Sequence, residues 1–213
     1  MNTKKRAVGN RVERKKEKTR QKIISISMNL FREQGFDSTS MEQIAKEVDI
    51  AKGTLYNYFP VKEAILSEYI QRSFEDRRAE RILQLRKLPD TRTRMIWILS
   101  ELIAGVRAQK DVFEKYLVYQ IQNMISLHRD AGVKSGIKLL AREIIVLGQE
   151  NEEIRQDIPL DILLALFEFA FIEVAQEFYM KPESFDAQVA IEYIVDLFMN
   201  WSKRRDMIWK IKK

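Results

Sequence analysis

Polar side chains crowd one short segment of the chain, KGTLYNYF at residues 52–59. It offers an ammonium group, hydroxyl groups and an amide beside a glycine, from Lys52, Gly53, Thr54, Tyr56, Asn57 and Tyr58. Such groups hydrogen-bond to phosphates and base edges, and a tyrosine ring can meet a thymine methyl. Gly53 permits close backbone approach. The segment therefore predicts contacts with DNA, although Tyr58, more than Tyr56, can instead fill part of the core.

Two short helices joined by a tight turn would present this segment. Residues 41–48 form the first predicted helix, capped by Ser40 or Thr39, and residues 52–59 form the second, ended by Pro60. Apolar residues seal the corner, with small Ala45 at the crossing: Ile44, Val48, Ile50, Leu55 and Phe59. Asp49 tolerates the left-handed backbone that the turn needs. This pattern favours a helix-turn-helix, although a plain helical hairpin would show the same apolar spacing.

Longer helices surround this pair. A helix is predicted at residues 14–34 and ends at Gly35, and six more are predicted at residues 62–85, 91–107, 111–128, 133–150, 160–179 and 184–205. The predicted fold is all-α: an N-terminal three-helix helix-turn-helix domain followed by a larger helical domain, about nine helices in total. We expect a disordered basic arm at residues 1–13, a DNA-binding domain at 14–65, and an effector-binding and dimerisation domain at 66–213.

Charge is distributed unevenly along the 213 residues. Residues 1–22 hold ten Lys and Arg against Glu13 and Glu17, a net charge of +8, which exceeds the +6 of the whole chain. A basic end on a nearly neutral body favours a polyanion as partner, although a solvated tail would look the same. The chain has no cysteine, no signal peptide and no apolar run long enough for a bilayer. We therefore expect a cytoplasmic protein without membrane contact.

These residues carry a resemblance to a known family. The segment FREQGFDSTSMEQIA at residues 31–45, KGTLYNYF at 52–59, and Lys62-Glu63 resemble the N-terminal domain of the tetracycline-repressor (TetR) family over about residues 18–66. The resemblance implies a dimeric transcriptional repressor that binds a palindromic DNA operator and is released by a small molecule. The sequence departs from the family pattern at Asp49, usually Gly, and at Ala51, usually a Ser or Thr cap.

Family contacts carry over to single positions of this sequence. Lys52 and Gly53 match residues that reach bases, and Thr54 and Asn57 match base-proximal or phosphate positions. Tyr56 and Tyr58 match phosphate contacts. The resemblance also implies phosphate contacts for Thr39 and Ser40, at the start of the second helix, and for Lys62, at the start of the fourth.

The resemblance also places the effector and the dimer. A small apolar or amphipathic effector is expected among residues 91–150, where aromatic and amide side chains cluster: Trp97, Phe113, Tyr116, Tyr119, Gln120, Asn123 and Met124. The same aromatic spacing also suits plain core. The family pairs its last two helices with those of a second copy, which implies an interface of Phe167, Phe171, Val174, Ile194, Phe198 and Trp201. The alternative interpretation is ordinary intrachain core.

Two other functions compete with this interpretation of the sequence. An enzyme is disfavoured because the sequence has no phosphate-binding glycine loop and no nucleophile motif. Its single histidine, His128, has Ile125 three residues before it rather than the glutamate of a carboxylate-bridged metal site. We expect neither a metal nor a cofactor. The second rival is a DNA-binding regulator without a small-molecule effector, either gated by a protein partner or constitutive, and the sequence leaves it open.

Overall fold

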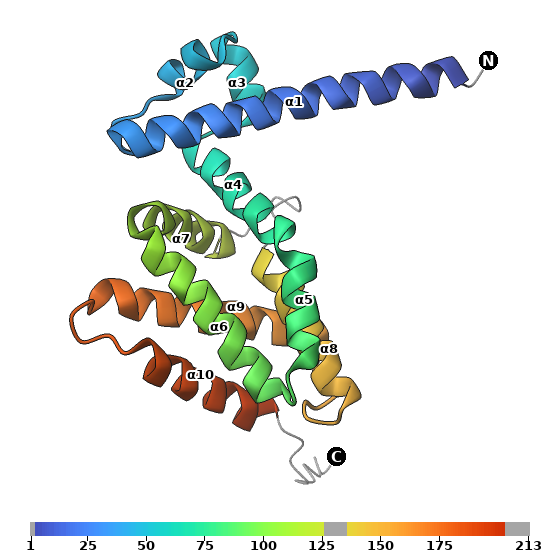
Figure 1. Cartoon of the computed structure of the whole chain (residues 1–213), viewed down its shortest axis with the longest axis vertical. Helices are drawn as coiled ribbons and strands as arrows, with labels where there is room; N and C mark the ends of the chain where they lie inside the picture. The colour runs from blue at the N-terminus through green and yellow to red at the C-terminus, as the bar shows by residue number, and fades with distance from the viewer. Residues whose placement is uncertain (1–2, 126–135, 203–213) are drawn as a thin grey trace, which may run out of the picture. The chain divides into compact units, whose positions relative to one another are not determined.

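The residues that the computed structural model describes, 3–125 and 136–202, form helices joined by turns and loops (Figure 1). Side chains are described for residues 12–122 and 136–202. His128 and the basic residues after 202 lie outside these ranges. The described residues form two compact units: an N-terminal unit of Met1–Arg72 with Val118–Ile125, and a C-terminal unit of the remainder. No helix in the described ranges combines the length and apolarity needed to cross a membrane.

The N-terminal unit is built on one long helix and two short ones. Its helices, the last two only in part, are α1 (Thr3–Gln34), α2 (Met41–Val48), α3 (Lys52–Tyr58), α4 (Lys62–Asp76) and α7 (Lys110–Ile125). Within it α2 packs on both α1 and α3 (Figure 1). The helix α1 begins at Thr3, whereas the sequence predicted disorder to residue 13. This N-terminal stretch is rich in Lys, Arg and Glu, which are good helix formers.

Apolar spacing explains the core of this unit. Ile23, Ile44, Val48 and Leu55 are fully buried, and Phe59 is 1% exposed. The predicted corner residues therefore lie inside, with Ala45 also buried, while Ile50 is half-buried. The predicted cap at Gly35 is confirmed, since its backbone has φ of +90° and its N–H donates to the Phe31 carbonyl at 3.1 Å.

The C-terminal unit holds the remaining helices. They are α5 (Arg78–Lys87), α6 (Thr91–Ala108), α8 (Gly136–Glu150), α9 (Leu160–Met180) and α10 (Ala187–Ser202), with the end of α4 and the first half of α7. The helix α6 packs against α8, α9 and α10, and α8 also packs against α5 and α9. Leu99, Ile144, Phe167, Phe171 and Val195 are at most 1% exposed and form the centre of this core.

One predicted helix is in fact two. The sequence predicted a continuous helix at residues 62–85, but α4 ends at Asp76 and α5 begins at Arg78. The residue between them, Arg77, has φ −97° and ψ 1°, outside helical geometry. Neither glycine nor proline lies at this break, so the helix propensities of the residues gave no indication of it. The described residues consequently contain ten helices rather than about nine.

Candidate nucleic-acid interface

The turn between α2 and α3 has the geometry that the sequence predicted. Asp49 adopts φ 61° and ψ 55°, the left-handed conformation, and its N–H donates to the Lys46 carbonyl at 3.1 Å. Ile50 N–H donates to the Ala45 carbonyl at 3.0 Å. Lys22 of α1 completes the end of α2 by donating to the Val48 carbonyl at 2.7 Å. A well-satisfied turn therefore fixes α3 against α2.

The two short helices begin differently. Ser40 caps α2, and its hydroxyl accepts a hydrogen bond from the Gln43 N–H at 3.1 Å. Ala51 precedes α3 and provides no side-chain hydrogen bond, as its type predicts. At the other end, Tyr58 is the last helical residue and Phe59 turns extended before Pro60. The helix α3 is thus short, uncapped and anchored by buried Leu55.

The predicted DNA-reading residues of α3 lie together on its surface. We call the exposed set the recognition surface: Lys52, Gly53, Thr54, Tyr56 and Asn57. Tyr58 is half-buried, whereas Tyr56 is 41% exposed. The Lys52 ammonium forms an ion pair with Glu42 and lies 5.9 Å from the centre of the Tyr56 ring. The hydrogen bond from Lys52 lowers the pKa of Glu42 and raises the pKa of Lys52.

The three residues outside α3 that the resemblance assigns to phosphates, Thr39, Ser40 and Lys62, lie in different environments. Ser40 is exposed at the start of α2, where backbone N–H groups favour anions. Thr39 is 1% exposed, and its hydroxyl donates to the Gly35 carbonyl at 2.8 Å. Lys62 donates to the carbonyls of Phe36 at 2.7 Å and Thr39 at 3.1 Å, and its ammonium lies 4.5 Å from the Phe36 ring centre.

An ionic network that we did not predict joins α1 to α4. The Arg20 Nε donates to both Glu68 carboxylate oxygens, at 2.8 and 2.7 Å. Arg72 donates to Glu68 and, at 2.7 Å, to Glu17 of α1. The hydrogen bond from Arg72 lowers the pKa of Glu17. The four-residue spacing of Glu68 and Arg72 was a visible signal, but the partners on α1 needed the fold.

The predicted effector residues are scattered over α6 and α7. Tyr116 is 2% exposed, and its ring centre lies 5.8 Å from that of half-buried Phe113. Gln120 is buried and donates to the Ser67 hydroxyl at 3.4 Å. Trp97 and Tyr119 are half-buried. The side chains of Asn123 and Met124 lie outside the described residues, so an effector pocket here stays a prediction.

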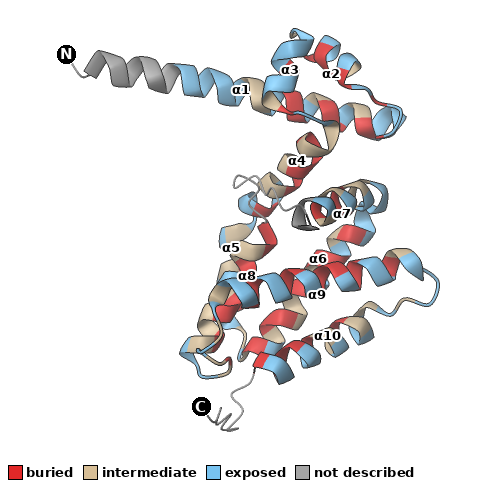
Figure 2. Cartoon of the chain, turned by 180° about the vertical axis from the view of Figure 1, so that it is seen from behind, coloured by how far each residue is buried: buried red, intermediate tan, exposed pale blue. Residues whose placement is uncertain are grey.

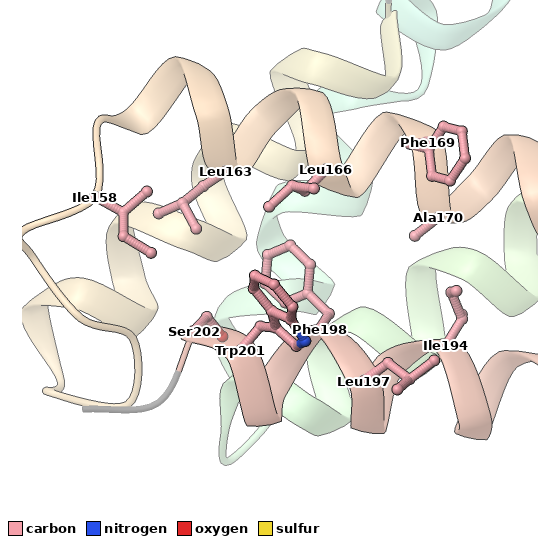
Figure 3. A pocket seen from close by; sticks show the side chains of 10 residues that line it. All are labelled: Ile158, Leu163, Leu166, Phe169, Ala170, Ile194, Leu197, Phe198, Trp201 and Ser202. Atoms are coloured by element: carbon pink, nitrogen blue, oxygen red, sulfur yellow. The ribbon is translucent and has the colours of Figure 1, made fainter. Parts of the chain in front are cut away.

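A second surface lies on α9 and α10, where exposed residues alternate with buried ones (Figure 2), and many of its exposed residues are large and apolar. We call it the α9–α10 face, and it consists of large residues that are 43–77% exposed: Ile162, Leu166, Phe169, Val189, Tyr193, Leu197 and Trp201. Between the two helices opens a pocket of about 240 Å³ (Figure 3). Leu166, Phe169, Leu197 and Trp201 line it, together with half-buried Ile194.

The residues of the dimer interface predicted from the sequence differ in exposure, and that interface stays a prediction. Phe167, Phe171 and Val174 are at most 2% exposed and pack within their own chain, whereas Phe198, 8% exposed, also lines the pocket. The rings of Phe167 and Phe198 meet edge to face, 6.3 Å apart. Trp201 is 77% exposed and stays available to a partner. Because α9 is apolar nearly all round, its sequence did not distinguish the inward side from the outward side.

The paired helices α2 and α3, with an exposed polar recognition surface, define a helix-turn-helix protein. Residues 23–69 match the family model described as bacterial regulatory proteins, tetR family. Over this N-terminal segment the chain is therefore similar to the TetR family of bacterial regulatory proteins.

Two relatives and two solved structures illustrate the likeness. The uncharacterized HTH-type transcriptional regulator YuxN of Bacillus subtilis is 36% identical over 96 residues, 45% of this chain and 33% of YuxN. UidR of Escherichia coli is 27% identical over 136 residues, 64% of this chain and 55% of UidR. The matches thus span between a third and just over half of these relatives.

The structural likeness extends further along the chain. Thermus thermophilus FadR, a TetR-family repressor solved with lauroyl-CoA, has a TM-score of 0.73 and 24% identity, covering 89% of this chain and 97% of FadR. RolR, solved with resorcinol, has a TM-score of 0.62 and 20% identity, covering 90% and 91%. At these identities the likeness establishes the fold of both units.

Proposed function

We propose that this chain is a sequence-specific DNA-binding transcriptional regulator, a repressor that a small molecule releases from its operator. The recognition surface carries this proposal, because Lys52, Tyr56 and Asn57 stand exposed on a helix fixed by a well-formed turn. Their ammonium, hydroxyl and amide groups suit base edges and phosphates. The match of residues 23–69 to a family of bacterial regulatory proteins supports a non-enzymatic role in the cytoplasm.

The proposed regulator acts as a homodimer through the α9–α10 face. A face with seven large exposed apolar residues in one region favours burial against another protein surface. A second copy is the partner that we propose, because a two-fold operator demands two recognition helices about one DNA turn apart, ~34–36 Å. The symmetric packing of two such faces would give each α3 its own half-site.

A small molecule is the proposed signal. FadR was solved with lauroyl-CoA and RolR with resorcinol, which supports a ligand-responsive role for a chain with the same fold. The half-buried aromatic residues Trp97, Phe113 and Tyr119 suit an apolar or amphipathic molecule. The alternative is a DNA-binding regulator without a small-molecule effector, either gated by a protein partner or constitutive.

Selection of duplexes from a random DNA pool by the full chain tests the DNA-binding function. We expect enrichment of a palindrome whose half-sites lie about one helical turn apart, bound by two chains. Lys52→Ala should fail to enrich it, while Lys87→Ala, an exposed lysine of α5, should behave as wild type. Enrichment without any shared sequence, or equal results for both variants, would contradict the proposal.

A further inference from the structure

Two arginines are buried in the C-terminal unit, and their surroundings differ. Arg94 of α6 is 5% exposed and donates to the carbonyls of Leu85 at 3.2 Å and Leu88 at 2.8 Å. The Glu153 carboxylate lies 3.9 Å from its guanidinium. Arg94 therefore has a structural role that is plain from its contacts, because it ties the end of α5 to the start of α6.

Arg81 of α5 lacks such contacts. It is 9% exposed, yet its buried Nε and Nη1 have no hydrogen-bond partner in the described ranges. Its guanidinium stacks on Phe74, 5.2 Å from the ring centre. Burial lowers the pKa of Arg81, and the positive charge of Arg77 lowers it further, while Glu101 and Glu80 act in the opposite direction.

The guanidinium of Arg81 lies at the start of α5. Phe74, which it contacts, belongs to the last turn of α4, before α5 begins at Arg78. The side chain thus points back along α5, as helical side chains do. The N-cap residue, Arg77, makes no side-chain hydrogen bond to the first N–H groups of α5. Those N–H groups carry the positive end of the helix dipole.

Two features at this point attract negative charge: a buried guanidinium whose Nε and Nη1 have no hydrogen-bond partner, and a helix N-terminus without a side-chain cap. Arg77, one turn earlier, already pairs with Glu101 at 4.0 Å. Burying a cation without a counter-ion destabilises a fold. A guanidinium presents parallel N–H donors that match the two oxygens of a carboxylate or phosphate. We propose that Arg81 binds an oxyanion, a carboxylate or phosphate group, on the small molecule that controls this regulator. The inference rests on the proposed function and specifies its ligand class as anionic.

The unfolding temperatures of two matched variants test whether Arg81 serves ligand binding rather than folding. We expect Arg81→Met to unfold at the wild-type temperature or up to about 4 °C higher, because it removes an unpaired buried charge. Arg94→Met should unfold at least about 4 °C lower, because it removes the hydrogen bonds to the Leu85 and Leu88 carbonyls and the positive charge beside Glu153. A loss for Arg81→Met equal to that for Arg94→Met would overturn the proposal.

Ligand probes that share an apolar tail but differ in their head group test directly whether Arg81 binds an anion. Octanoate carries a carboxylate, octyl phosphate carries a phosphate, and 1-octanol is the neutral control. Near-saturating amounts of at least one anionic probe should raise the unfolding temperature of the full-length wild type by about 5 °C. The probe that does so identifies the head group. Arg81→Met should lose this rise, while Arg81→Lys should keep part of it.

Each other outcome has a definite meaning. Equal stabilisation of wild type and Arg81→Met, or no more stabilisation by either anion than by 1-octanol, would overturn the proposal. Operator binding is measured separately, and Arg81→Met should bind the selected palindrome as wild type does. If wild type selects no DNA sequence, the proposed function fails, whereas an Arg81-dependent anion response would remain a property of the chain.

Discussion

The recognition surface and the α9–α10 face are both exposed, but their chemistry is opposite. The first presents an ammonium, hydroxyls and an amide, whereas the second presents seven large apolar side chains. Polar groups that stay hydrated can exchange water for phosphates and base edges. Large apolar groups gain most by leaving water altogether. The kind of exposed side chain therefore indicates a nucleic acid at one surface and a protein at the other.

Breaking the apolar surface should have the largest effect. Leu197→Glu places a charge in the proposed dimer interface, so we expect monomers and a loss of operator affinity of about 100-fold or more. Leu83→Glu is the control, because Leu83 is 62% exposed on α5 and Leu197 is 58% exposed. Light scattering and fluorescence anisotropy measure the two effects. Dimers that persist in Leu197→Glu would place the interface elsewhere.

Changing the polar surface should have a smaller effect and leave the dimer intact. Lys52→Ala removes an exposed cation of α3, and we expect operator affinity to fall by about 10- to 100-fold at unchanged thermal stability. Lys87→Ala serves as the matched lysine control. Gel shifts on the selected palindrome measure the loss. Wild-type affinity in Lys52→Ala would remove this residue from the recognition surface.

Two roles can be distinguished for Lys62, because the resemblance makes it a phosphate contact, whereas the structure surrounds it with backbone carbonyl groups. We expect Lys62→Met to lower the free energy of unfolding by about 2 kcal/mol, since charged hydrogen bonds are lost. The salt dependence of operator binding should stay unchanged. Chemical denaturation and titrations at several salt concentrations measure both. A shallower salt slope at full stability would support the phosphate contact instead.

The basic segment before the recognition surface should contribute through charge alone. Deleting residues 1–13 removes four basic residues and one glutamate. We expect operator affinity to fall roughly 10-fold at low salt and much less at high salt, because screening weakens such contacts. Anisotropy titrations at two salt concentrations suffice. Unchanged affinity at low salt would leave the segment without a role in binding.

The smallest expected effect concerns the uncapped start of α3. Ala51→Ser would supply the missing hydrogen bond to the first N–H groups of the helix. We expect a gain of about 1 kcal/mol in the free energy of unfolding. Ala104→Ser on α6, an exposed position in the helix interior, provides the control. Thermal unfolding measures both variants, and an equal loss in each would show that residue 51 does not act as a cap.

Local chemistry made the helix-turn-helix predictable from the sequence. The Asp49 turn, the Ser40 cap and the end of α3 before Pro60 each depend on a few neighbouring residues. Features set by tertiary packing were harder to predict. The break at Arg77 has no breaker residue, and the contacts of Lys62 join residues more than twenty positions apart.

The inward side of α9 was also beyond sequence reasoning. Phe167 and Phe169 are apolar residues of one type two positions apart, yet one is fully buried and the other 57% exposed. The packing of α6, α8 and α10 against α9 decides which of them faces inward. The proposed anionic ligand class could not be inferred from the sequence either, because nothing in the sequence distinguishes Arg81 from the paired arginines around it.

The α9–α10 face has a consequence for gene dosage if it pairs two chains as proposed. Below the dissociation constant of the dimer, the amount of dimer rises with the square of the chain concentration. Doubling the number of chains in a dilute cell would then quadruple the species able to occupy both half-sites. The seven apolar side chains of this face would thereby set a concentration threshold for repression, independently of any signal molecule.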